Sequence, residues 1–250
     1  MAKNILITGA SSGIGEALAL HYAKSGVDNL FICGRNEARL NEVKEKCLKH
    51  GINVHSKIID VCDRNKVKDW LEECEKIAPL NIIYANAGVS TGEEIPENIF
   101  NTFNINVMGT LNVVVPATEI FKNRKDKEKT IVITASIAGY HGLPSCPSYS
   151  ASKACIKAYG EALRGSLRKY GIKVCVICPG FVRSRITDKN TCPMPFFMEA
   201  DKAANIIATR VNKNIGLIAF PWPMRFVTWL MSILPNRFSD FIYERLPHKV

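Results

Sequence analysis

Asn4-Ile-Leu-Ile-Thr8-Gly9-Ala-Ser-Ser-Gly13-Ile-Gly15 is the stretch that decides the fold. Its first five residues predict a short apolar strand, and the glycines that follow it open a helix. Glycine lets the backbone turn tightly and approach a phosphate closely, and the amides at a helix N-terminus attract anions. The spacing is GxxxGxG, not the commoner GxGxxG, and the GK[ST] of a Walker A loop is missing. The turn therefore predicts a phosphate-binding site.

Strand and helix patterns alternate along the rest of the chain. Further strands are predicted over 29–33, 54–59, 80–85, 131–135, 172–177 and 216–220, and helices over 37–50, 63–76, 149–170, 199–212 and within 95–117. Such alternation is typical of a parallel sheet with helices on both faces. We therefore expect a single α/β domain of the Rossmann-like, doubly wound kind, with seven parallel strands over residues 1–220. Ligands bind such sheets at the carboxyl ends of the strands.

The composition is that of a globular protein, with 47% hydrophobic and 22% charged residues among 250. The formal net charge of +10 fits either attraction to anions or a solvated basic surface. The densest basic run, 122–129, contains two acidic residues and no aromatic ones, unlike a platform for single-stranded nucleic acid. We therefore expect no nucleic-acid partner.

Nine cysteines are scattered along the chain. Cys175 and Cys178 form a CxxC inside a predicted strand, where residues three apart point to opposite faces. This spacing favours neither a metal site nor a disulfide, so no metal is expected, and the usage indicates a reducing, cytoplasmic compartment. The N-terminus has no signal-peptide pattern, and no apolar run approaches the roughly 18 residues of a membrane span.

The end of the second predicted strand bears on the choice of cofactor. About 20 residues past the glycine loop, dinucleotide-binding proteins carry an Asp or Glu that binds the ribose 2′-hydroxyl. Gly34 stands there, followed by Arg35. A guanidinium suits a 2′-phosphate, so the pattern favours NADP(H) over NAD(H). The alternative is a solvated arginine in a loop.

Tyr149-Ser-Ala-Ser-Lys153 is the candidate catalytic stretch. A tyrosine and a lysine four apart share one helix face, and an ammonium beside a phenol favours proton exchange near neutral pH. Ser136, at the end of a predicted strand, offers a hydroxyl for a carbonyl oxygen. Asn106 lies within a predicted helix, where asparagine is unfavourable. It either faces solvent or perturbs the helix at a site.

Taken together, these motifs resemble the classical short-chain dehydrogenase/reductase family over residues 1 to about 185. The shared motifs are TGASSGIG at 8–15, Asp60-Val61, NAG at 86–88, Asn106, Ser136, YSASK at 149–153 and Pro179-Gly180. The resemblance implies hydride transfer between NADP(H) and a carbonyl or secondary alcohol. No catalytic position is missing, which implies an active enzyme. The alternative is an NADP(H)-binding redox sensor that regulates a partner without significant turnover.

The resemblance also implies a role for each site residue. Tyr149 is the general acid/base, Ser136 orients the substrate oxygen, and Asn106 anchors a water of a proton relay. Lys153 lowers the pKa of the tyrosine and binds the nicotinamide ribose. The implied cofactor contacts are Gly9, Ser11, Ser12, Gly13, Ile14, Gly15, Arg35, Asp60, Val61, Asn86, Ala87, Gly88, Tyr149, Lys153, Pro179, Gly180, Val182 and Ser184. Ser184 replaces a threonine that the family often has, and keeps its hydroxyl.

The last part of the chain is where the substrate should be recognised. In the family, the segment at about 184–200 is a mobile substrate lid, and its apolar side chains indicate either an apolar substrate or packing on the core. Residues 221–250 form an apolar, aromatic extension. It covers the cleft, extends an oligomer interface, or touches a membrane surface through 222–245 as an interfacial helix does. We expect a homodimer or homotetramer and a small, apolar substrate of unassigned identity.

Overall fold

The computed structural model describes residues 3–90, 92–126, 128–188 and 193–235. Within these residues, parallel strands form one seven-stranded sheet in the order β3-β2-β1-β4-β5-β6-β7. The strands are β1 (Asn4–Thr8), β2 (Asn29–Gly34), β3 (Asn53–Ile58), β4 (Ile82–Ala85), β5 (Thr130–Thr134), β6 (Lys173–Pro179) and β7 (Leu217–Phe220). The predicted doubly wound parallel sheet is confirmed. Its order reverses between β1 and β4, where such sheets bind ligands.

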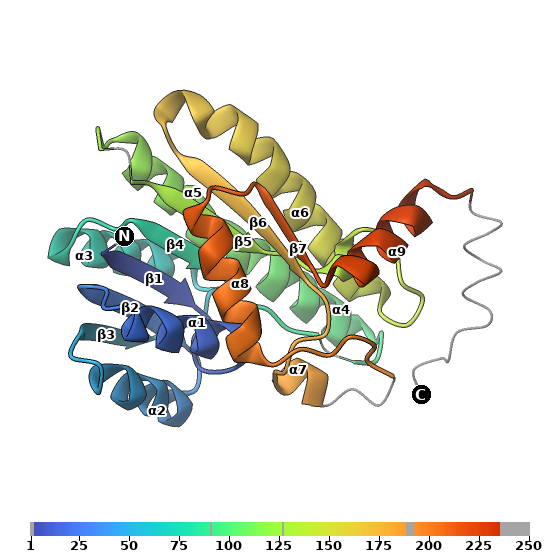
Figure 1. Cartoon of the computed structure of the whole chain (residues 1–250), viewed down its shortest axis with the longest axis horizontal. Helices are drawn as coiled ribbons and strands as arrows, with labels where there is room; N and C mark the ends of the chain where they lie inside the picture. Colours follow the sequence, from blue (N-terminus) through green and yellow to red (C-terminus); the bar gives the residue numbers. More distant parts are fainter. Residues whose placement is uncertain (1–2, 91, 127, 189–192, 236–250) are drawn as a thin grey trace.

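Helices cover both faces of the sheet (Figure 1). They are α1 (Gly13–Lys24), α2 (Glu37–Leu48), α3 (Arg64–Ile77), α4 (Pro96–Phe103), α5 (Gly109–Lys122), α6 (Pro147–Leu167), α7 (Arg185–Asp188), α8 (Ala200–Asn212) and α9 (Trp222–Ile233). One core cluster packs α1, α2 and α8 on one face. A second packs α3, α5 and α6 on the other. Burial of both faces explains why the central strands are continuously apolar.

The alternation of side chains within the strands divides these two clusters. Ile5 and Ile7 of β1 belong to the cluster under α1, whereas Leu6 belongs to the opposite one. Cys175 and Cys178 of β6 are likewise buried on opposite faces. The two thiols therefore do not face each other, as their spacing in a strand predicts.

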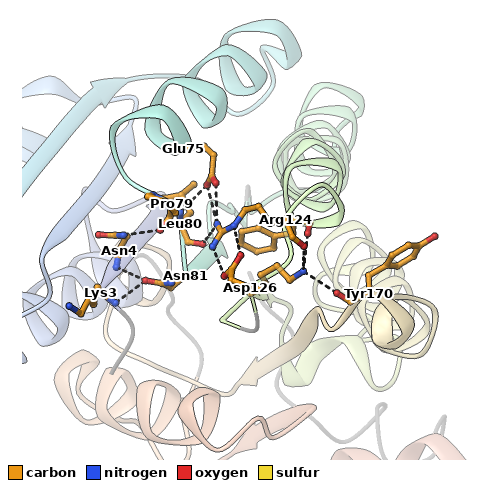
Figure 2. A network of polar contacts seen from close by, with 11 residues as sticks. Lys3, Asn4, Glu75, Pro79, Leu80, Asn81, Arg124, Asp126 and Tyr170 are labelled. Carbon is orange, nitrogen blue, oxygen red and sulfur yellow. Dashed lines mark hydrogen bonds and ion pairs between the residues drawn. The ribbon is translucent and has the colours of Figure 1, made fainter.

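A polar network closes the amino end of the sheet, away from the strand ends that bind ligands. Arg124 Nη1 donates to the Leu80 carbonyl (2.6 Å) and to Glu75, as Figure 2 shows. The buried Lys129 donates from Nζ to three backbone carbonyl oxygens, those of Phe121, Arg124 and Tyr170. These bonds satisfy a buried charge and carbonyls that would otherwise lack partners. They tie the loops before β4, β5 and β6 together.

The apolar extension folds in part into α9, which follows β7 directly. Met231 is its buried residue, and Met224 packs against the core cluster. Residues 236–250 of the extension lie outside the described residues. Of the helices that the structure describes, none has the length and apolar content needed to cross a membrane.

Candidate active site

A cavity of about 410 Å³ opens at the carboxyl ends of the strands. Most of the predicted site residues line it, namely Gly9, Ser11, Ser12, Gly13, Ile14, Arg35, Val61, Asn86, Ala87, Gly88, Ser136, Tyr149, Lys153, Pro179, Gly180, Val182 and Ser184. Three others, Gly15, Asp60 and Asn106, are not part of the lining. Residues from the carboxyl ends of six strands, β1 to β6, and from α6 therefore meet in one cleft, as expected at the switch point of a parallel sheet.

The glycine loop closes the cleft at the start of α1. Gly9 and Gly13 have φ of +66° and +58°, which strongly favours glycine. A Cβ on Gly15 would lie 2.2 Å from the Gly9 carbonyl oxygen, so Gly15 lets α1 approach the turn. Within the described residues, Ser12 gives α1 no side-chain cap. The backbone amides of the first turn of α1 are therefore uncapped beside a glycine loop that lies close to the cleft. This arrangement fits a dinucleotide pyrophosphate.

Two arginines line the cleft near the end of β2, Arg35 directly after the strand and Arg39 in the first turn of α2. Arg35 Nη1 lies 3.5 Å from Asp60 Oδ2, and both side chains are exposed. Burial opposes ionisation of Asp60, but hydrogen bonds from Cys62 and the charge of Arg35 outweigh it and lower the pKa of this carboxyl. Asp60 thus forms an ion pair with an arginine that lines the cleft. Arg39 also lines the cleft, and its Nε is buried with no hydrogen-bond partner among the described residues.

Arg39 was missed at the level of sequence. It lies in the first turn of α2, four residues after Arg35, and both arginines line the cavity. Asn36 caps α2 by accepting from the Arg39 backbone N–H (3.0 Å), which sets the first turn of the helix at the cleft. An unpaired buried guanidinium nitrogen is costly. The two arginines therefore form a cationic end to the cleft that suits an anionic ligand group.

Tyr149 and Lys153 extend from α6 toward Ser136 at the end of β5. Lys153 Nζ lies 5.8 Å from the centre of the Tyr149 ring and donates to the Thr134 carbonyl oxygen (3.0 Å). Burial raises the pKa of Tyr149 to about 12, although a hydrogen bond with Ser136 opposes this. Burial also lowers the pKa of Lys153 to about 8. In the polypeptide alone, desolvation of the phenol dominates its pKa, and the Lys153 ammonium bonds a carbonyl oxygen. The role of Lys153 in lowering the pKa of Tyr149 stays a prediction.

Asn106 lies in a turn of π-helix, η1 (Asn104–Met108), which interrupts the predicted helix between α4 and α5. It is fully buried. Its Oδ1 accepts from Val89 N (2.8 Å), while its Nδ2 donates to Val89 O (2.9 Å) and to Ser152 Oγ (3.0 Å). The side chain therefore perturbs the helix, which was one of the two expected explanations. Short π-helical turns of this kind are frequent at functional sites.

Ser152 is a second residue that sequence reasoning missed. It is fully buried, accepts from Asn106 and donates to the Tyr149 carbonyl oxygen (2.8 Å). Gly88 closes the same corner, since a Cβ there would lie 3.1 Å from Lys153 Nζ and 3.2 Å from Asn106 Oδ1. The π-helical turn is thereby joined to the helix that carries the tyrosine.

Comparison with known proteins places this site in a family. The family model for short chain dehydrogenases matches residues 3–193. The chain belongs to the classical short-chain dehydrogenase/reductase family. An uncharacterized oxidoreductase of Myxococcus xanthus is 33% identical over 98% of this chain and 97% of its own length. Human 17-beta-hydroxysteroid dehydrogenase 13 is 26% identical over 95% of this chain and 81% of its own.

Solved structures share the fold of this short-chain dehydrogenase/reductase. A family member from Burkholderia phymatum in complex with NAD superposes with a TM-score of 0.83 at 23% identity, over 100% of this chain and 97% of that one. A short-chain dehydrogenase from Sphingobium yanoikuyae in complex with NADPH gives 0.79 at 22% identity, over 97% and 93%. The chain is thus a dehydrogenase or reductase of a family that uses nicotinamide cofactors.

The predicted lid of this short-chain dehydrogenase/reductase begins and ends at one clasp. Val182 pairs with Met198 in a β-bridge, and Arg183 forms an exposed ion pair with Glu199 (2.7 Å). Between them, α7 contributes Arg185, Ile186 and Thr187 to the cleft lining. Residues 189–192 of the lid lie outside the described residues. The clasp brings the two ends of the segment together beside the cleft.

Proposed function

We propose that this short-chain dehydrogenase/reductase transfers hydride between NADP(H) and the carbonyl or secondary alcohol of an apolar substrate. The observation that carries the proposal is that Ser136, Tyr149 and Lys153 line the same cavity as the glycine loop. A proton donor and a dinucleotide cradle in one cleft are the two parts that carbonyl reduction requires.

The cleft offers a group for each part of the cofactor. The loop from Gly9 to Gly15 and the uncapped amides of α1 suit the pyrophosphate, and Lys153 suits the nicotinamide ribose. Arg35 and the unpaired Nε of Arg39 support NADP(H) over NAD(H), since two cations match a 2′-phosphate. When bound, the cofactor supplies or accepts the hydride.

The protein's own residues handle the proton. Ser136 Oγ donates a hydrogen bond to the substrate carbonyl oxygen and polarises it. The Tyr149 hydroxyl then gives its proton to that oxygen. With a pKa of about 12, the phenol holds its proton at neutral pH, which is the form that reduction needs. Asn106 and Ser152 hold the backbone of α6 and of Val89, so the tyrosine stays in place.

Apolar groups around the cleft support an apolar substrate. Val89 and Ile186 line the cavity, and Phe196 of the lid is exposed. Met224 of α9 packs against the turn at Gly180, where a Cβ would lie 2.9 Å from its sulfur. The human relative is named for a hydroxysteroid, an apolar alcohol. Such surroundings favour a ketone or alcohol with a large hydrocarbon part.

The test is oxidation of NADPH with a panel of apolar ketones and aldehydes. We expect Tyr149→Phe to lower kcat by at least about a hundredfold while NADPH still binds, because the proton donor is lost. Tyr159→Phe, on the same helix but packed against the core, is the matched control and should keep activity. Near-normal turnover of Tyr149→Phe would contradict the mechanism. Nicotinamide binding with no turnover on any carbonyl would favour the redox sensor instead.

We further propose that the protein is a cytoplasmic homodimer or homotetramer. Its eight described cysteines are all unpaired, which fits a reducing compartment. Multi-angle light scattering of the full chain measures the assembly directly, and a monomer would contradict this part of the proposal.

A further inference from the structure

The outer face of α9 is a row of exposed apolar side chains. We call Trp222, Phe226, Trp229, Leu230 and Ile233 the α9 stripe. Their spacings of four, three, one and three residues place them on one side of a helix. Trp222 is 75% exposed and Ile233 58%, which is unusual for side chains of this size. Within the described residues, this side of α9 is therefore largely exposed.

The inner face of α9 fixes the helix on the rim of the cleft. Met231 is buried, and Met224 packs on the core cluster. The sulfur of Met224 and the ring of Pro221 lie so close to Gly180 that a Cβ there would meet them at 2.9 and 3.1 Å. Figure 1 shows α9, in red, beyond the carboxyl ends of the strands. The stripe thus belongs to the surface around the mouth of the cleft.

Charge decides which occupant this surface suits. α9 contains one basic residue, the exposed Arg225, and no Asp or Glu. The whole chain carries a formal net charge of +10. A second copy joined two-fold through the stripe would bring each Arg225 near its equivalent, and α9 supplies no carboxylate to pair with either. An anionic surface instead complements both the cation and the net charge.

Length and composition select the kind of anionic surface. The 12 residues of α9 extend about 18 Å at about 1.5 Å per residue. The hydrocarbon core of a bilayer is about 30 Å thick. The helix is therefore too short to span it, but long enough to lie in its plane. Tryptophan prefers the boundary between headgroups and acyl chains, because its ring is apolar and its N–H is polar. Two tryptophans on one face orient the helix at that boundary.

We propose that the α9 stripe docks this protein on the surface of an anionic phospholipid bilayer, with α9 parallel to the membrane plane. Apolar side chains enter the headgroup boundary and Arg225 contacts lipid phosphates. The mouth of the cleft then faces the lipid. This contact does not depend on the reaction, so it holds or fails separately from the proposed oxidoreductase activity.

Tryptophan fluorescence tests the contact on the full chain without a mutation. The chain has three tryptophans, and the third, Trp70, is only 3% exposed in the core under α3. Vesicles of phosphatidylcholine and phosphatidylglycerol with brominated acyl chains should quench Trp222 and Trp229 but not Trp70. The double variant Trp222→Phe, Trp229→Phe should retain the Trp70 emission and lose the quenching. No quenching of the unmodified chain would overturn the proposal.

Vesicle flotation gives a second, matched test. Trp222→Ser with Phe226→Ser should lower the vesicle partition coefficient by about tenfold or more, because two large apolar side chains no longer enter the lipid. Phe100→Ser is the control, since Phe100 on α4 is 74% exposed and lies outside the stripe. Equal loss in both variants would overturn the assignment to α9, and equal binding to vesicles of phosphatidylcholine alone would overturn the role of charge. A stripe variant that dissociates an oligomer without changing flotation would assign α9 to a subunit interface.

Discussion

Replacing Lys153 by methionine should abolish turnover and stabilise the folded protein at neutral pH. The side chain is 4% exposed, and burial lowers its pKa from 10.5 to about 8. Below about pH 8, Lys153 is protonated in both the folded and the unfolded protein, so folding carries the full cost of burying its charge. Between about pH 8 and 10.5 the unfolded chain binds a proton that the folded chain does not, and stability rises with pH. Above that range the cost is absent.

The magnitude follows from the shift and from one hydrogen bond. A pKa lowered from 10.5 to about 8 corresponds to about 3 kcal/mol. Methionine removes this cost, but it also leaves the buried Thr134 carbonyl without the Lys153 donor, which costs about 1–2 kcal/mol. We therefore expect Lys153→Met to raise the free energy of unfolding by about 1–2 kcal/mol at pH 7. The gain should shrink by about 1 kcal/mol per pH unit above pH 8.

Urea unfolding of both proteins, without cofactor, at about pH 7 and about pH 9.5 measures this difference. Buried cysteines and tyrosines titrate in both proteins, so the difference between the two isolates Lys153. A variant that is less stable by the same amount at both pH values would refute the argument. Lys129→Met is the matched control: that buried ammonium donates to three carbonyl oxygens, and its removal should destabilise the fold by about 2 kcal/mol.

Two further predictions concern the residues that sequence reasoning missed. Arg39→Met should raise the Kd for NADPH by about 10- to 100-fold and leave the Kd for NADH nearly unchanged, because a charge-assisted bond to the 2′-phosphate is lost. Cofactor titration by fluorescence measures both constants, and an equal rise in the two would contradict the prediction. Ser152→Ala should lower kcat about tenfold with little change in the KM for NADPH, because Tyr149 loses its link to Asn106. Steady-state kinetics measure both constants, and an unchanged kcat would exclude the positioning role of Ser152.

The sheet could be predicted from the sequence because its signals are local. Strands such as β5 and β6 are mainly apolar runs. Gly9 and Gly13 mark a turn whose positive φ angles favour glycine. Element boundaries were close but not identical: α6 begins at Pro147, two residues before the predicted start, since proline is favoured in the first helical turn. Interactions between neighbours along the chain determine all of these features.

The π-helical turn at Asn106 could not be predicted, because its cause is not local. The segment has the apolar pattern of one continuous helix over 95–117. What interrupts it is a set of three hydrogen bonds of the Asn106 side chain. Its Oδ1 accepts from the backbone N–H of Val89, 17 residues away, and its Nδ2 donates to the Val89 carbonyl oxygen and to Ser152 Oγ, 46 residues away. The pKa of Tyr149 likewise depends on residues that are distant in the sequence. Spacing on a helix predicts the approach of Lys153, but not the burial that outweighs it.

For the apolar extension, the sequence pattern indicates an apolar helix, and the structure shows which of its faces is buried. Trp222 and Met224 are both apolar and two residues apart, so the sequence alone leaves open which face of the helix is covered. Gly180 determines which face is covered. Because it has no side chain, Met224 packs onto the turn beside the cleft, and Trp222 points outward. A side chain at Gly180 would need the space that the sulfur of Met224 occupies. The same small residue that borders the cleft therefore determines which side of α9 is presented to solvent.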